Sequence, residues 1–261
     1  MRALGVDVGG PNKGLDVVAL DEDLTIVEHR AHVPVYGLSA MLGELVPDVI
    51  AIDSPPALAL SGSSRKAERD LGSIGIHSYA TPSERERLDE PFYTWMKVGF
   101  EAYGAASACG FPRYARGPVR GTAVEVFPHA TVTVLKGCLP PARASKRAWR
   151  SAELSARGVG AEALTSVDQI DAGLAALTGL LALQGEFCGV GDPVEGVIVL
   201  PAGPSQIQHP YTRCPGEPTG DDEPSPDDDR RRSLLWTRVR IGRQAERELS
   251  SRGWELPPEM R

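Results

Sequence analysis

The sequence lacks the features that mark a membrane protein or a disulfide-stabilised one. No run of apolar residues approaches the ~20 residues that a membrane-spanning helix needs, and the first residues lack the charged-then-apolar pattern of a leader peptide. The four cysteines are scattered and form no CxxC pair, which argues against a disulfide scaffold. We therefore expect a soluble, cytoplasmic protein in reducing surroundings.

Several catalytic signatures are also missing. There is no GxxxxGK[ST] phosphate loop, since Pro11 follows the glycine-containing residues 5–10, and there is no GxSxG. His29 and His32 are three residues apart on an expected strand and so face opposite sides of it. These absences count against a Walker ATPase, a serine hydrolase and a zinc site.

Charge is unevenly distributed along the chain. The net charge is -7, from 28 Lys+Arg and 35 Asp+Glu. Residues 217–229 hold seven acidic residues and no basic one, whereas residues 111–157 hold nine basic residues and two acidic ones. The acidic average therefore does not exclude an anionic partner such as nucleic acid.

The apolar pattern predicts an α/β protein. Short turns separate the first three apolar segments, which predicts antiparallel strands, and a helix followed by a fully apolar strand indicates a crossover into a parallel part of the sheet. The expected strands are 3–8, 15–20, 24–30, 49–53, 122–127 and 197–200, and the expected helices are 38–46, 65–71, 146–157, 170–183.

The same pattern predicts three parts of the chain. Residues 1–203 are expected to form the folded domain. Residues 204–233 are rich in proline and acidic residues, which predicts a disordered linker. Residues 234–261 are expected to form a C-terminal helical extension.

Three carboxylates interrupt segments that are otherwise apolar. Asp7 lies within the first strand, Asp53 ends the fourth, and Glu125 lies within the strand 122–127. An ionised carboxylate loses several kcal/mol of solvation in a dry interior unless a partner compensates. A bound divalent cation is the simplest common cause.

Two further carboxylates open the long apolar helix. Asp168 and Asp171 are three residues apart, which places both on one helical face, and the first turn of a helix favours negative charge. Asp168 or Ser166 could instead be an ordinary N-cap. Together with the strand carboxylates, the pair favours a metal site.

In combination, these segments resemble the RNase H-like fold, and the paired aspartates of the late helix resemble those of Holliday-junction resolvases. More closely, the chain resembles domain-of-unknown-function family 429, described as predicted RNase H-like nucleases. The resembling motifs are G-V-D at 5–7, I-A-I-D-S-P at 50–55, R-x-x-x-R-D-L-G at 65–72, V-E-V-F-P at 124–128, D-x-x-D-A at 168–172 and E-G-V-I-V-L-P at 195–201.

The resemblance implies a mixed sheet of five or more strands, with the first three antiparallel, later strands parallel, and helices on its faces. It also implies that the aspartates converge at one end of the sheet to bind Mg²⁺ or Mn²⁺, with two ions in a phosphodiester-hydrolysing site. In that site Asp7 is the bridging ligand, Asp53 and Asp171 flank it, and Asp168 or Glu125 is a further ligand or water-orienting base.

Basic side chains supply the expected contacts to substrate phosphates. Arg65 and Arg69 lie one helical turn apart, and Lys146, Arg147 and Arg150 gather in the next basic helix. The alternative for residues 146–157 is an ordinary solvated helix face.

A second interpretation comes from another reaction class. Residues 5–13 also resemble the first phosphate loop of sugar kinases and actin-like ATPases, in which Asp53 would be the candidate base. That family needs a second, similar domain, and residues 160–261 contain no Gly-Gly pair. A third interpretation is a catalytically silent RNase H-like binding protein. The oligomeric state is not readable from the sequence.

Overall fold

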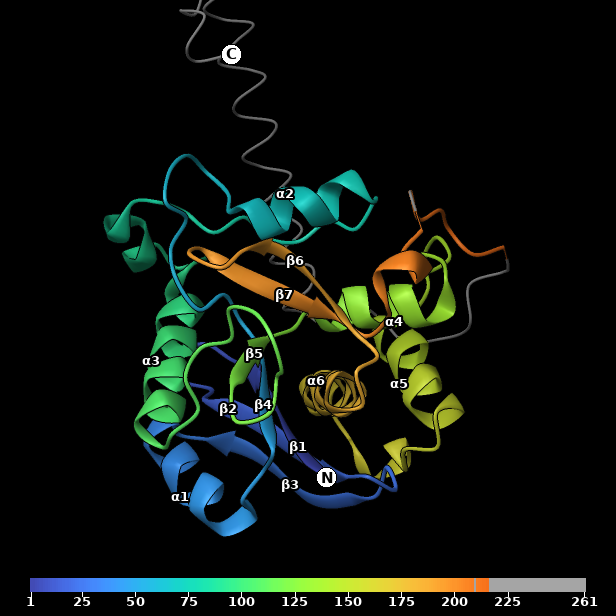
Figure 1. The fold of residues 1–261 in the computed structure, drawn as a ribbon, viewed down its shortest axis with the longest axis horizontal. Coiled ribbons are helices and arrows are strands. Elements are labelled where there is room, and N and C mark those ends of the chain that lie inside the picture. Colours follow the sequence, from blue (N-terminus) through green and yellow to red (C-terminus); the bar gives the residue numbers. More distant parts are fainter. Residues whose placement is uncertain (209, 216–261) are drawn as a thin grey trace, which may run out of the picture. The chain divides into compact units, whose positions relative to one another are not determined.

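The computed structural model describes residues 1–208 and 210–215, which contain one seven-stranded mixed sheet with the strand order β3-β2-β1-β4-β5-β7-β6 (Figure 1). The strands are β1 (Arg2–Val8), β2 (Leu15–Asp21), β3 (Ile26–Val33), β4 (Val49–Asp53), β5 (Ala123–Glu125), β6 (Cys188–Asp192) and β7 (Gly196–Leu200). The α-helices are α1 (Val35–Leu45), α2 (Lys66–Ser73), α3 (Thr94–Ala108), α4 (Pro128–Lys136), α5 (Lys146–Ala156) and α6 (Val167–Leu183).

The pairing of the strands confirms the expected RNase H-like sheet. Strands β1, β2 and β3 are antiparallel neighbours, and β4, β5 and β7 continue the sheet in parallel from β1. Strand β6, which the sequence analysis did not expect, pairs antiparallel with β7 at the edge.

Helices cover both faces of the sheet. On one face α1 and α3 pack against the side chains of Leu4, Val6 and Ile50. On the other face α6 packs across β1, β2 and β4, flanked by α4 and α5 (Figure 1). Because side chains alternate along a strand, Ala3, Gly5 and Asp7 of β1 all face α6.

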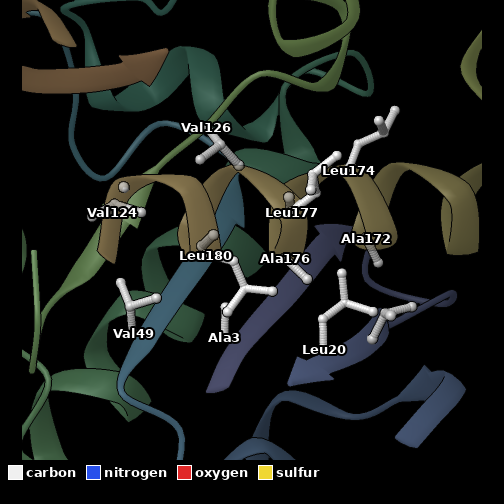
Figure 2. Packing of buried hydrophobic residues seen from close by; sticks show 14 of the residues in the cluster. Ala3, Leu20, Val49, Val124, Val126, Ala172, Leu174, Ala176, Leu177 and Leu180 are labelled. Carbon is white, nitrogen blue, oxygen red and sulfur yellow. The ribbon is translucent and has the colours of Figure 1, made fainter. Parts of the chain in front are cut away.

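Helix α6 begins at a side-chain cap and lies very close to the sheet. Ser166 accepts a hydrogen bond from the amide of Gln169 at 3.0 Å, so it is the N-cap and Asp168 is not. A Cβ on Gly5 would lie within 3.0 Å of backbone atoms of α6. Figure 2 shows Ala176 and Leu180 on the side of the helix that faces the strands.

The folded part of the chain extends past the boundary expected at residue 203. Tyr211 is buried, and its amide donates to the carbonyl oxygen of Ile74 at 2.8 Å. The linker therefore does not begin at residue 204. The remainder of the expected linker, from residue 216, and the expected extension 234–261 lie outside the described residues.

Two cysteines differ from the sequence-based expectation. Cys138, just after α4, forms a disulfide with Cys214, 76 positions later in the chain. Cys109 and Cys188 are free. Scattered spacing did not show this pairing, because tertiary packing brings the two residues together. Among the residues that the structure describes, no helix is both long and apolar enough to cross a bilayer.

Candidate metal centre

Two aspartates meet where neighbouring parallel strands end. Asp7 of β1 and Asp53 of β4 are register partners, and both face α6. The carboxyl ends of parallel strands reach the same edge of a sheet, so the two carboxylates lie side by side. Only 8% of Asp7 is exposed to solvent.

The first turn of α6 brings two more carboxylates over this edge. Asp168 and Asp171 lie one turn apart on α6, and Asp171 is buried. The close approach of α6 to β1 at Gly5, two residues before Asp7, holds this turn against the strand ends. Oxygen atoms of Asp7, Asp53 and Asp171 lie within 4.8 Å of one another.

A fifth aspartate joins the site from β2. Asp16 is the register partner of Asp7 across the antiparallel β1–β2 pair, and oxygen atoms of Asp7, Asp16 and Asp168 also lie within 4.8 Å of one another. Sequence reasoning missed Asp16, although it too interrupts an apolar strand. The signal that selected Asp7 and Asp53 would have selected it.

Crowding of buried negative charge perturbs the carboxylates. Burial raises the pKa of Asp7 well above its usual range, and the negative charge of Asp171 raises it further. Burial likewise raises the pKa of Asp53 to about 7, with the charge of Asp171 adding to the shift and that of Arg150 opposing it. Burial also raises the pKa of Asp16.

Three cations surround the cluster. Arg150 donates to both carboxylate oxygens of Asp171, and Lys146 Nζ lies 3.4 Å from Asp171 Oδ2. These cations are one turn apart on α5, which begins at the N-cap Ser145. Lys13, in the turn after β1, pairs with Asp168.

The donor set fits a hard divalent cation. Within residues 1–208 and 210–215, no hydrogen-bond donor reaches the side-chain oxygens of Asp7 or Asp53, and Asp16 Oδ2 is buried without a partner. Buried carboxylate oxygens without donors are costly. Clustered carboxylate oxygens are the ligands that Mg²⁺ and Mn²⁺ take, and each of the two groups that share Asp7 offers such a set.

Glu125 and Arg65 lie away from this cluster. Glu125 pairs in register with Ile52, so its side chain is on the sheet face opposite Asp53. Arg65 is 1% exposed, and its Nη1 donates to Glu125 at 2.8 Å while its Nε donates to Glu68 at 2.9 Å. The placement of Glu125 as a ligand or base and of Arg65 at substrate phosphates is therefore corrected: the two form a buried ion pair.

The other expected phosphate contacts divide in the same way. Arg69 is exposed on α2, where its Nη1 donates to the carbonyl oxygen of Ser64, and α2 packs against β6 rather than against α6. Arg147 is exposed on α5, next to Lys146 in sequence. Of the expected basic residues, the structure brings Lys146 and Arg150 to the aspartates.

The turn that resembles a kinase phosphate loop is closed on itself. The amide of Gly9 donates to the carbonyl oxygen of Gly14 at 2.9 Å, and the amides of Lys13 and Gly14 donate to that of Gly10. These amides are used within the turn and do not point outward to cradle a phosphate, as the kinase interpretation requires.

Comparisons with known proteins concern the family and the fold. The sequence model of the family described as "Protein of unknown function (DUF429)" matches residues 5–195. No curated protein matches the chain. T. thermophilus RuvC in complex with a Holliday junction substrate is similar at a TM-score of 0.40 and 17% identity, over 71% of this chain and 96% of that chain. A second structure of Thermus thermophilus RuvC is similar at a TM-score of 0.38 and 15% identity, over 71% of this chain and 97% of that chain.

Proposed function

The chain belongs to the DUF429 family, and we propose that it is a nuclease that hydrolyses phosphodiester bonds with Mg²⁺ or Mn²⁺. The main support for this proposal is the cluster of Asp7 on β1, Asp53 on β4 and Asp171 on α6, whose carboxylate oxygens lie within 4.8 Å of one another. These elements come from distant parts of the chain.

Each carboxylate has a distinct place in the proposed site. We assign Asp7 as the shared ligand, because it alone belongs to both carboxylate groups. Asp53 and Asp171 flank it on one side, and Asp168 lies on the other. When bound at such a cluster, two divalent ions supply Lewis acidity and lower the pKa of coordinated water.

The α5 cations have two different tasks in this proposal. Arg150 is buried and holds both oxygens of Asp171, so it positions that carboxylate. The Lys146 side chain is 40% exposed and lies beside the same carboxylate, so its ammonium can reach a phosphate oxygen from solvent. A nucleic acid is the substrate class that this combination of metal ligands and a partly exposed cation suits.

Metal binding and strand cleavage test the proposal together. Calorimetry with Mn²⁺ on the wild type, Asp7→Asn and Asp171→Asn should show binding that both substitutions weaken by at least about tenfold. Asp23→Asn is the matched control, because Asp23 is an exposed acid in the turn after β2 and the charge change is the same. Its Mn²⁺ affinity should equal that of the wild type.

Cleavage assays then identify the reaction. Single-stranded, duplex and branched DNA and RNA should be tested with Mg²⁺, with Mn²⁺ and with chelator, and ATP hydrolysis serves as the control reaction. Metal-dependent cleavage that Asp7→Asn abolishes supports the nuclease. Metal binding without any cleavage would favour a silent binding protein, and turnover of ATP alone would favour a kinase-like enzyme.

A further inference from the structure

A second carboxylate group lies beside the first and shares Asp7 with it. Its other members are Asp16 on β2 and Asp168 at the start of α6, with oxygen atoms of all three residues within 4.8 Å of one another. Asp16 faces Asp7 directly across the antiparallel strand pair. The two groups therefore lie on opposite sides of the Asp7 carboxylate, one toward β4 and one toward β2.

Asp16 has no partner that explains its burial. Its relative exposure is 2%, and among the described residues its Oδ2 meets no hydrogen-bond donor. A buried carboxylate oxygen without a donor costs the full desolvation of that atom. Val18 and Leu20, on the same face of β2 as Asp16, are buried apolar residues, so this face of the strand accommodates apolar side chains. The carboxylate at position 16 thus indicates a positively charged ligand.

One cation already reaches this group, from the turn between β1 and β2. Lys13 pairs with Asp168 through its ammonium. Burial lowers the pKa of Lys13, but the hydrogen bond to Asp168 and the negative charges of Asp168, Asp7 and Asp16 outweigh this effect. The pKa of Lys13 is therefore raised. The Lys13 side chain is 39% exposed, so it has a path to solvent.

We propose that Asp7, Asp16 and Asp168 form a second divalent-cation position. In the metal-free protein the Lys13 ammonium occupies this position, and it moves out when an ion binds. This inference rests on the proposed metal-dependent function. It adds Asp16 as a ligand and makes the two positions unequal. At the position formed with Asp53 and Asp171 the buried Arg150 stays on Asp171, whereas the position formed with Asp16 fills in exchange for the more exposed Lys13.

Calorimetric titration with Mn²⁺ alone tests the exchange, with no substrate and no activity measurement. The wild type is expected to bind two ions, the second more weakly. Lys13→Met keeps the length of the side chain without its charge, and should tighten the second ion by about tenfold or more. Asp16→Asn should abolish the second ion and leave the affinity for the first within about threefold, in the wild type and on the Lys13→Met background.

Asp23→Asn serves again as the control for an acidic residue outside the group, and it should leave both ions unchanged. Circular dichroism and thermal melting check the fold of each variant. Asp16→Asn is nearly isosteric and removes an unpaired buried charge, so we expect it to melt no lower than the wild type without metal. Should it fail to fold, the Lys13→Met titration alone decides.

The outcomes separate this inference from the proposed function. If the wild type binds no Mn²⁺, both are overturned. If Asp16→Asn still binds two ions, or Lys13→Met binds Mn²⁺ as the wild type does, the second position is overturned while the Asp7, Asp53 and Asp171 group stands. Loss of one ion in Asp16→Asn with a tighter second ion in Lys13→Met establishes the exchange.

Discussion

Replacing Gly5 with alanine should damage both the stability of the domain and the proposed metal centre. The new Cβ would lie within 3.0 Å of three backbone atoms of α6, the carbonyl oxygen of Ala172 and the amide nitrogen and Cα of Ala176. Because backbone atoms cannot rotate away, β1 and α6 must separate by about 1.4 Å or more, so that the 2.0 Å contact reaches an ordinary van der Waals distance of 3.4 Å. Overpacking of this kind costs typically 1–3 kcal/mol, and we expect the upper end of that range.

The same displacement moves the first turn of α6 away from Asp7. A shift of about 1 Å at a site costs on the order of 100-fold in rate, and we expect a comparable loss of Mn²⁺ affinity. Urea unfolding gives the change in free energy, and calorimetry gives the affinity.

Gly104→Ala is the matched control for this substitution. Gly104 is an exposed position within α3, and a Cβ there meets no atom within 4 Å. Alanine should stabilise this helix by about 0.5–1 kcal/mol and leave the affinity of the proposed centre for Mn²⁺ unchanged. If Gly5→Ala unfolds at the same urea concentration as Gly104→Ala and binds Mn²⁺ equally well, the argument that α6 is seated on β1 at Gly5 is refuted.

Three further predictions concern pH, the buried ion pair and the disulfide. The pKa of Asp53, about 7 against an ordinary 3.8, means that the folded, metal-free protein holds more protons than the unfolded one between these values. Its stability should therefore fall as pH rises from about 4 to about 7, and urea unfolding in chelator should show a smaller fall for Asp53→Asn. Arg65→Met leaves two buried carboxylates unpaired and should cost about 3–5 kcal/mol of unfolding free energy. The control Arg69→Met, at an exposed position, should cost less than about 0.5 kcal/mol. Equal melting temperatures of the two variants would contradict the buried ion pair. Cys214→Ser should lower the unfolding free energy by about 2–4 kcal/mol under oxidising conditions. Cys109→Ser should show no such loss, and adding a reductant to the wild type should produce the same loss.

Much of the sheet could be predicted because its strands are short, apolar and separated by clear turns. The crossover from α1 into β4 predicted the parallel pairing, and the family resemblance implied that Asp7 and Asp53 converge at one end of the sheet, where their register places them. The interruption of an apolar strand by a carboxylate misassigned Glu125, because it does not reveal which face of the sheet the carboxylate occupies. The face on which a strand residue lies depends on the register of the strand. The register that pairs Glu125 with Ile52 is set by packing between distant segments of the chain.

Two other elements could not be predicted because their local composition does not match their secondary structure. Helix α4 contains the β-branched run 131–134, which favours a strand by local propensity, but burial against neighbouring elements makes it helical. Strand β6 carries two glycines and is only partly buried at the edge of the sheet, so it lacks an apolar pattern. The partner of Arg65 was equally invisible, since 60 positions separate it from Glu125.

The pairing of Lys13 with Asp168 spans 155 positions of the chain. A ribosome adding 5–20 residues per second needs roughly 8–30 s to cover that distance. Throughout this interval the nascent chain carries Asp7 and Asp16 but not the helix that completes either carboxylate group. Neither carboxylate group can therefore be complete during this interval, and the cluster forms only once the sheet has received its covering helix.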